Sequence, residues 1–155
     1  MVFSEVLDLS AIAPRATATD KRQVLALISD MAGRNFGLDA SVILDALAER
    51  EQAGSTGLGR GVAVPHARLE GLNRMRAVFL RLEHPVDFAS VDDQPVDLVF
   101  ALFSPMAQGG SAHLQGLARI SRLMRQKDLR EQLRQSRAAE AIRALLVQDI
   151  RQTAA

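Results

Sequence analysis

The run VDLVFALF, residues 96–103, is apolar except for Asp97. A continuous apolar run without strand-like alternation is typical of a central strand that is buried on both faces of its sheet. Two other β-compatible runs precede it along the chain, at residues 61–64 and 77–82. A sheet of this kind must be covered by other elements, and in α/β folds helices cover it.

Helical periodicity flanks the strand region on both sides. One helix is predicted to begin after Asp20 and to stop at Gly33 or Gly37, and a second helix ends at Gly54. The chain after the last strand is helical, and its first helix is predicted to bury one face, formed by Leu114, Leu117, Ile120, Ser121 and Met124. The expected fold class is therefore α/β, a small mixed β-sheet flanked by helices.

Length and composition predict one domain. The chain has 155 residues and 48% of them are apolar, which is enough for a single core. We expect residues 1–19 to form an irregular N-terminal segment and residues 20–150 to form the domain. The absence of cysteine excludes disulfides and thiolate sites. No run approaches the ~20 apolar residues of a membrane helix and no leader is visible, so we expect a cytoplasmic protein without membrane insertion.

Charge is unevenly distributed along the chain. Residues 1–110 carry 10 basic and 14 acidic side chains, whereas residues 111–155 carry 9 basic and 4 acidic ones. A basic helical tail can contact nucleic acid or an acidic partner, but this tail has no aromatic side chain to stack on bases. We expect no nucleic-acid partner and interpret the tail as an exposed helix face.

The stretch GSTGLGRG, residues 54–61, holds four of the ten glycines. Closely spaced glycines allow backbone N–H groups to converge on an anion. The predicted phosphate-binding loop comprises Gly54, Ser55, Thr56, Gly57, Gly59 and Gly61, with Arg50 nearby and with Arg60 and Arg68 as further possible contacts. The alternative is a mobile turn without a ligand. The sequence lacks the Gly-Lys-Ser/Thr of a Walker A loop.

His66 is the candidate nucleophile. Imidazole ionises near neutral pH, so its free nitrogen is available, and Pro65 stiffens the chain before it. Beside an anion-binding loop it could accept a phosphoryl group, because phosphoryl transfer depends mainly on positioning and charge stabilisation. The alternative is a histidine without a chemical role. The other histidines, His84 and His113, give no metal-binding spacing, so no metal and no cofactor are expected, and His84 is interpreted as structural or exposed.

Residues 50–66, REQAGSTGLGRGVAVPH, match the pattern R-E-x-x-G-S-T-G-[IL]-G-x-G-[IV]-A-[IV]-P-H at every fixed position. This pattern resembles the active-site signature of the IIA components of the bacterial phosphoenolpyruvate-dependent phosphotransferase system. The resemblance is to the fructose/mannitol class, and most closely to its nitrogen-regulatory branch. Residues 94–102 and 112–114 add supporting matches, and the resemblance extends over residues 5–147.

The resemblance implies roles for particular residues. His66 would accept phosphate from a histidine phosphocarrier protein, and Arg50 would stabilise the phosphoryl group. His113, at the start of a later helix, would support the phosphorylated state. Ser55 and Thr56 would line the site.

The sequence departs from the family pattern directly after the active histidine. Members often have Gly-Lys there, where this chain has Ala67 and Arg68. A cation is retained and Ala67 is small, so we expect little effect.

Three functions are compatible with these residues. The first is a regulatory phosphoacceptor whose targets, by resemblance, would be proteins such as a sensor kinase or a potassium transport system. The second is a IIA subunit that passes phosphate to a fructose/mannitol-type sugar permease. The third is an anion-sensing or protein-interaction domain that is never phosphorylated. Whether the chain acts as an enzyme stays open, because its phosphohistidine would be an intermediate with a regulatory purpose.

Overall fold

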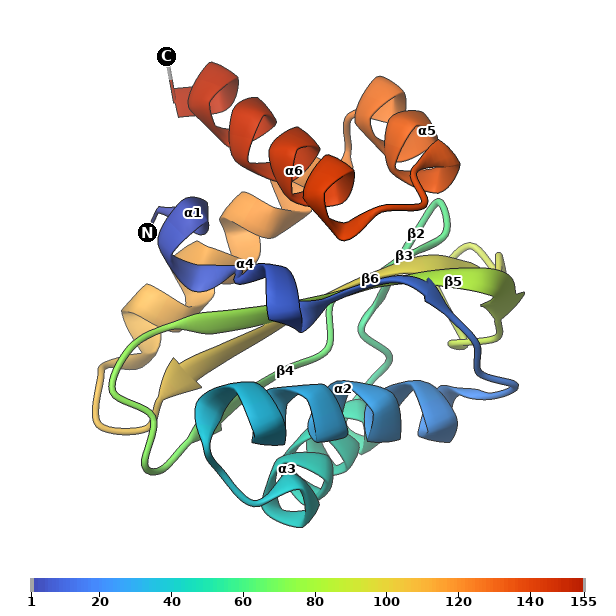
Figure 1. Cartoon of the computed structure of the whole chain (residues 1–155). Coiled ribbons are helices and arrows are strands. Elements are labelled where there is room, and N and C mark those ends of the chain that lie inside the picture. Colours follow the sequence, from blue (N-terminus) through green and yellow to red (C-terminus); the bar gives the residue numbers. More distant parts are fainter. Residues whose placement is uncertain (1, 155) are drawn as a thin grey trace.

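Strand β6 (Val96–Pro105) lies at the centre of a six-stranded mixed sheet between two helical layers (Figure 1). The structure is a computed structural model that describes residues 2–154, and side chains up to residue 147. The other strands are β1 (Ile12–Ala16), β2 (Gly57–Gly59), β3 (Val62–Ala63), β4 (His66–Leu69) and β5 (Arg76–Val86). One layer holds α2 (Lys21–Phe36) and α3 (Ala40–Gln52); the other holds α1 (Phe3–Val6), α4 (Gly110–Met124), α5 (Lys127–Gln135) and α6 (Ala139–Ala154).

The two sides of β6 pair differently. On one side β5 is antiparallel to β6, and β1 is parallel to β5 at the sheet edge. On the other side β3 and β4 are both parallel to β6. Val62 pairs with Leu98 and His66 pairs with Leu102, which is the same offset. Strands β3 and β4 therefore form one extended path along β6, and this path places His66.

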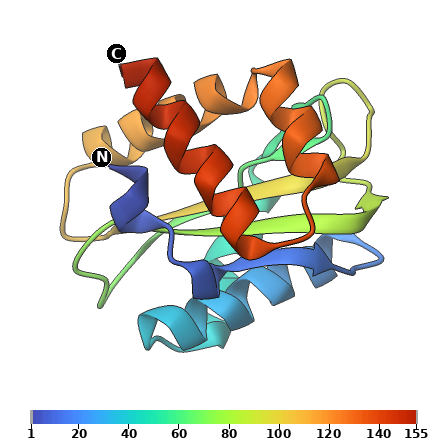
Figure 2. The same cartoon turned by 45° about the horizontal axis from the view of Figure 1, so that its top comes forward.

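Both faces of β6 are buried, as the apolar run predicts. Val99, Ala101 and Phe103 belong to the core beneath α2 and α3, whereas Leu98, Phe100 and Leu102 belong to the core beneath the other helices. This alternation follows from the two-residue period of a strand. Figure 2 shows α6 crossing over the second of these faces. The α/β class and the mixed sheet flanked by helices are confirmed.

Helix α2 begins and ends on signals that the sequence carries. The Asp20 carboxylate accepts a hydrogen bond from the Gln23 amide at 2.8 Å, and Gly37 ends the helix in a left-handed conformation, with φ 72°. Gly33, the other expected stop, lies inside the helix instead. A side chain there would lie 3.0 Å from the Leu38 carbonyl oxygen, so this glycine allows the α2–α3 connection to pack closely.

The N-terminal segment differs from the sequence prediction. Residues 1–19 were expected to be irregular, but they contain α1, a 3-10 turn at Leu9–Ala11 and strand β1. Phe3 is buried, and its ring centroid lies 5.7 Å from that of Phe100. These elements are too short to show a periodicity, and contacts with the rest of the core stabilise them instead.

Other differences concern strand ends and one helix face. Strand β5 continues through His84 and Pro85, because its register with β6 shifts and then resumes at Val86. Strands β2 and β4 are too short or too rich in glycine to be predicted. On α4, Ile120 and Met124 are buried as predicted, but Leu114 is 66% exposed and Leu123 only 2% exposed, so the buried face is rotated from the predicted one.

The two leucines of α4 give a matched test of this rotation. Leu123→Ala is expected to lower the free energy of unfolding by about 3 kcal/mol, because it removes buried methyl groups and leaves a cavity. Leu114→Ala should change it by less than about 0.5 kcal/mol, because that side chain is exposed. Urea titrations of both variants measure these values, and equal losses would contradict the observed helix face.

Candidate functional site

His66 begins β4 with its ring tautomer fixed by the backbone. Its Nδ1 lies 2.9 Å from the Val64 carbonyl oxygen, which can only accept a hydrogen bond. Nδ1 therefore carries the ring hydrogen, and Nε2 keeps a free electron pair. The ring is half-buried, and the neighbouring Pro65 carbonyl accepts a hydrogen bond from the Leu102 amide of β6 at 3.0 Å. The pairing of this path with β6 thus positions the predicted nucleophile, Nε2 of His66.

Arg50, in the last turn of α3, contacts that nitrogen. Its Nε donates a hydrogen bond to His66 Nε2 at 3.0 Å, and its Nη1 donates to the Gly54 carbonyl at 2.7 Å. The second bond fixes the guanidinium against the loop that follows the helix. The predicted pair of Arg50 and His66 is therefore brought into direct contact.

The pKa of His66 is lowered from its ordinary value. Burial is the main cause, and the nearby charge of Arg50 acts in the same direction. The Val64 carbonyl and the Glu51 carboxylate oppose this shift. A lowered pKa keeps the imidazole neutral at physiological pH, which is the form that can act as a nucleophile.

A buried carboxylate holds the loop after α3. Glu51 accepts hydrogen bonds from the Thr56 amide at 2.9 Å and from the Thr56 hydroxyl, and it forms an ion pair with Lys21 at 2.9 Å. The Ser55 hydroxyl donates to the Phe88 carbonyl at 2.5 Å. Both predicted loop hydroxyls therefore fasten the loop in this structure, and their contact with a phosphoryl group stays a prediction.

Three glycines of the predicted loop, Gly57, Gly59 and Gly61, lie in or beside the β2–β3 hairpin, which extends away from His66. Strands β2 and β3 pair antiparallel, and Gly61 precedes His66 by five residues on the extended path, which corresponds to roughly 16 Å. A side chain at Gly57 would clash with the Ser90 hydroxyl, and one at Gly59 would lie 3.1 Å from the Asp92 carboxylate. Close packing explains these glycines, and their predicted phosphate contact stays untested.

Arg60 and Arg68, the two further arginines predicted as possible phosphate contacts, lie at different ends of the path formed by β3 and β4. Arg60 is at the tip of the hairpin, where its amide donates to the Asp92 carboxylate at 2.8 Å. Arg68, on β4, donates to the carbonyls of Met106 and Gln108. Arg68 therefore fastens the loop that leads into α4, whereas Arg60 belongs to the other end of the hairpin.

His113 lies beside His66, as the resemblance implies. It is buried in the first turn of α4, and the two ring centroids are 5.3 Å apart. Its Nδ1 lies 2.6 Å from the hydroxyl of Ser104 on β6. Burial, and then the charges of His66 and Arg68, lower the pKa of His113 from 6.5 to about 4. A neutral imidazole therefore faces His66.

Several residues of this site were missed in the sequence. Ser104 contacts His113, and Lys21 pairs with the Glu51 carboxylate. Val64 acts on His66 through its backbone carbonyl, which every residue type has and which the sequence therefore does not reveal. Glu51 is a fixed position of the 50–66 pattern, and Ser104 is the polar residue that directly follows the apolar run. The sequence therefore marks both positions, but it does not predict that Glu51 holds the loop or that Ser104 contacts His113.

The lowered pKa of His113 predicts a pH-dependent stability. The folded protein resists protonation of this ring down to about pH 4, whereas an unfolded chain binds the proton near 6.5. The stability that the neutral His113 ring contributes to the folded state is therefore complete above pH 6.5 and is lost as the pH falls toward 4. Urea unfolding across this range should show a steeper loss in the wild type than in His113→Gln, with the carboxylates contributing equally to both. Parallel curves would contradict the assignment.

Comparison with known proteins places this site in a family. Residues 5–149 match the family described as phosphoenolpyruvate-dependent sugar phosphotransferase system, EIIA 2. A nitrogen regulatory protein of Bradyrhizobium diazoefficiens is 40% identical over 146 residues, which cover 94% of this chain and 95% of that protein. A fructose-specific EIIA component of Haloferax volcanii is 33% identical and covers 93% of this chain and 97% of its own length.

A solved structure agrees with these relatives. The crystal structure of the nitrogen regulatory protein IIA-Ntr from Neisseria meningitidis superposes with a TM-score of 0.88 at 34% identity, over 94% of this chain and 99% of that one. Within residues 2–154, none of the helices is long and apolar enough to cross a membrane. The chain is similar to nitrogen regulatory proteins, and it belongs to the EIIA 2 family of the phosphoenolpyruvate-dependent sugar phosphotransferase system.

Proposed function

We propose that this protein accepts a phosphoryl group on Nε2 of His66 and regulates other proteins through its phosphorylation state. The observation that supports this most directly is the fixed tautomer. Val64 holds the hydrogen on Nδ1, so the electron pair of Nε2 faces Arg50. The similarity to nitrogen regulatory proteins supports the regulatory role.

The donor is a histidine phosphocarrier protein, and the step moves only the phosphoryl group. The Nε2 electron pair of His66 attacks phosphorus, a P–N bond forms on His66, and the P–N bond of the donor breaks. The electron pair of that bond stays on the donor imidazole. The hydrogen stays on Nδ1 throughout and is donated to the Val64 carbonyl, so His66 needs no separate proton transfer.

Arg50 and His113 stabilise the charge that arrives. The Arg50 Nε–H, which donates to Nε2 in this structure, can turn to an anionic phosphoryl oxygen while the Gly54 carbonyl keeps the guanidinium in place. The phosphoryl charge raises the pKa of the neighbouring His113, because an opposite charge favours the protonated form. Protonation of His113 is therefore more favourable in the phosphorylated state than in the free one.

Similarity to fructose-specific relatives supports a second function. The match to a fructose-specific EIIA component is compatible with a subunit that supplies phosphate to a sugar permease of the fructose/mannitol type. The chemistry at His66 would be the same, and only the recipient would differ. In the regulatory role the phosphorylation state of His66 would instead control binding to target proteins, such as a sensor kinase or a potassium transport system.

Mass spectrometry tests the acceptor. Incubation with phosphoenolpyruvate and the two upstream phosphotransferases should add about 80 Da in an acid-labile form. His66→Ala should abolish this gain, and Arg50→Ala should slow it about 100-fold, because a charge-stabilising donor is lost. His84→Ala is the matched control and should be phosphorylated normally, since His84 is exposed on β5. Phosphorylation that survives His66→Ala would contradict the assignment.

A further inference from the structure

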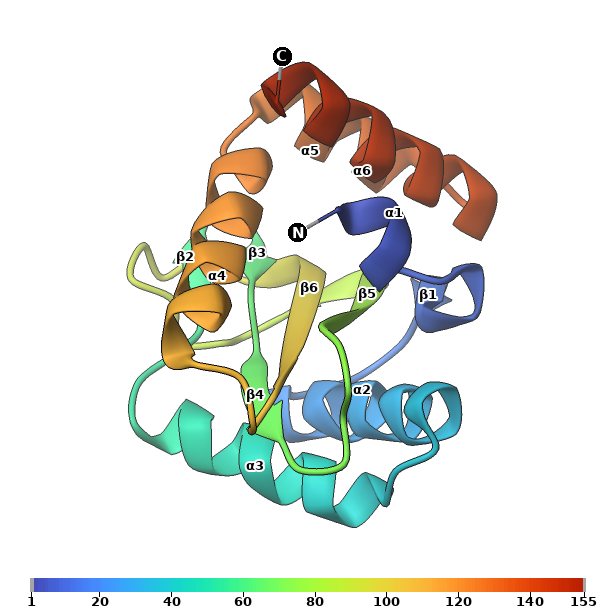
Figure 3. The ribbon, with the colours of Figure 1, turned by 90° about the vertical axis from the view of Figure 1, so that its left-hand side faces the viewer.

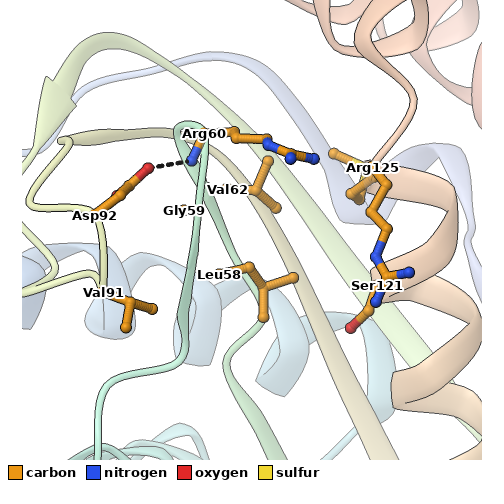
Figure 4. A pocket seen from close by; sticks show the side chains of 9 residues that line it. Leu58, Gly59, Arg60, Val62, Val91, Asp92, Ser121 and Arg125 are labelled. Atoms are coloured by element: carbon orange, nitrogen blue, oxygen red, sulfur yellow. Dashed lines mark hydrogen bonds between the residues drawn. The ribbon is translucent and has the colours of Figure 1, made fainter.

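A cavity lies at the opposite end of α4 from the histidines (Figure 4). Its volume is about 420 Å3, and the β2–β3 hairpin, the turn at residues 91–92 and the C-terminal part of α4 bound it. His113 is in the first turn of α4 and Met124 is its last residue, so about 16 Å of helix separates them. Figure 3 shows α4 running between these two ends of the sheet. The cavity is therefore distinct from the phosphoryl site.

The cavity has an apolar floor and an apolar rim. Val62 and Met124 form the floor and are buried, with exposures of 1% and 2%. At the rim, Leu58 is 45% exposed and Val91 is 88% exposed. Apolar side chains exposed around a recess are typical of a ligand or partner site.

Two arginines give the cavity a positive charge. Figure 4 shows the Arg60 side chain extending toward Arg125, the residue that follows α4. In the part of the chain with described side chains, neither guanidinium makes a hydrogen bond or an ion pair. The single carboxylate in the lining, Asp92, accepts hydrogen bonds from the backbone amides of Arg60 and Gln94 at 2.8 and 3.1 Å. Each Asp92 oxygen therefore already accepts one backbone hydrogen bond, and these bonds lower the pKa of this carboxyl. The charge of Arg60 helps to lower this pKa without forming an ion pair with Asp92.

The backbone around the cavity is held in an unusual conformation. Among the described residues, the non-glycine residues with positive φ are Arg60, Ala89 and Asp93, and all three lie in the hairpin and the loop beside the cavity. Such residues are uncommon and tend to occur at ligand sites. The Arg60 carbonyl also accepts a hydrogen bond from Arg134 at 2.6 Å. An arginine is therefore fixed where a glycine would fit more easily, which indicates a role for its side chain.

We propose that this cavity binds a small organic anion, whose carboxylate or phosphate contacts Arg60 and Arg125 while its apolar body packs on the floor and rim. The volume lies within the ~300–1,000 Å3 of typical small-molecule sites. Three chain segments bound the recess, which suits a small ligand better than a flat protein surface. A bare inorganic anion leaves the apolar surface exposed, and a neutral ligand forms no ion pair with the two guanidinium groups.

Titration with phenyl phosphate, followed by NMR of the backbone amides, tests this site. The amides of Leu58, Arg60 and Arg125 should shift in a saturable way, and inorganic phosphate or phenol should bind about tenfold more weakly. Arg60→Gly and Arg125→Ala should each weaken binding about tenfold, because each removes a charged hydrogen bond. Arg60→Gly suits the positive φ, so it removes the side chain without straining the hairpin.

Matched controls separate this cavity from the phosphoryl site. Arg122→Ala removes an exposed arginine in the last turn of α4 and should leave phenyl phosphate binding unchanged. His66→Ala should also leave binding unchanged. The cavity proposal can therefore be refuted while the phosphorylation proposal stands, and the phosphorylation proposal can be refuted while the cavity proposal stands. Shifts that centre on His66 and vanish in His66→Ala would overturn the proposal. So would unchanged affinity in Arg60→Gly and Arg125→Ala, or binding of an acidic peptide without binding of phenyl phosphate.

Discussion

Burial of β6 on both faces is the constraint on which the site depends. A strand packed between two helical layers cannot slip by one residue, because a slip would exchange the side chains of its two faces. Its fixed register places His66 opposite Leu102, and two residues later Ser104 contacts His113. A strand whose own side chains are almost all apolar thus brings together two histidines that lie far apart in the sequence.

The two nitrogens of His66 are held by groups of different kinds. A carbonyl at Nδ1 can only accept, and a guanidinium at Nε2 can only donate, so together they specify one neutral tautomer. The charge of Arg50 also disfavours protonation of Nε2, the atom that must stay free. An anionic oxygen is a stronger acceptor for Arg50 than a neutral ring nitrogen. Under the proposed phosphorylation, the contact with Arg50 would therefore strengthen in the transition state, which is the condition for lowering a barrier.

The sequence predicts the local parts of this arrangement and misses the tertiary ones. The α/β class and the His66–Arg50 pairing come from an apolar run and from one contiguous pattern, both readable over a few residues. Strand β1 and the Ser104–His113 contact depend on segments that meet only in the folded chain. On α4 the inward positions include His113 and Gly116, which are not hydrophobic markers, so the apolar periodicity indicated a rotated face.

The glycine-rich stretch connects two regions of different chemistry. Its glycines let the β2–β3 hairpin pack against the 88–97 segment, where a side chain at Gly57 would clash with Ser90. The tip of the hairpin forms one wall of the cavity with Arg60. At its base the Val64 amide donates to the Thr56 carbonyl at 2.9 Å, and the Val64 carbonyl holds His66. Backbone freedom in this stretch therefore serves close packing, and the same packing fixes the carbonyl that selects the tautomer of His66.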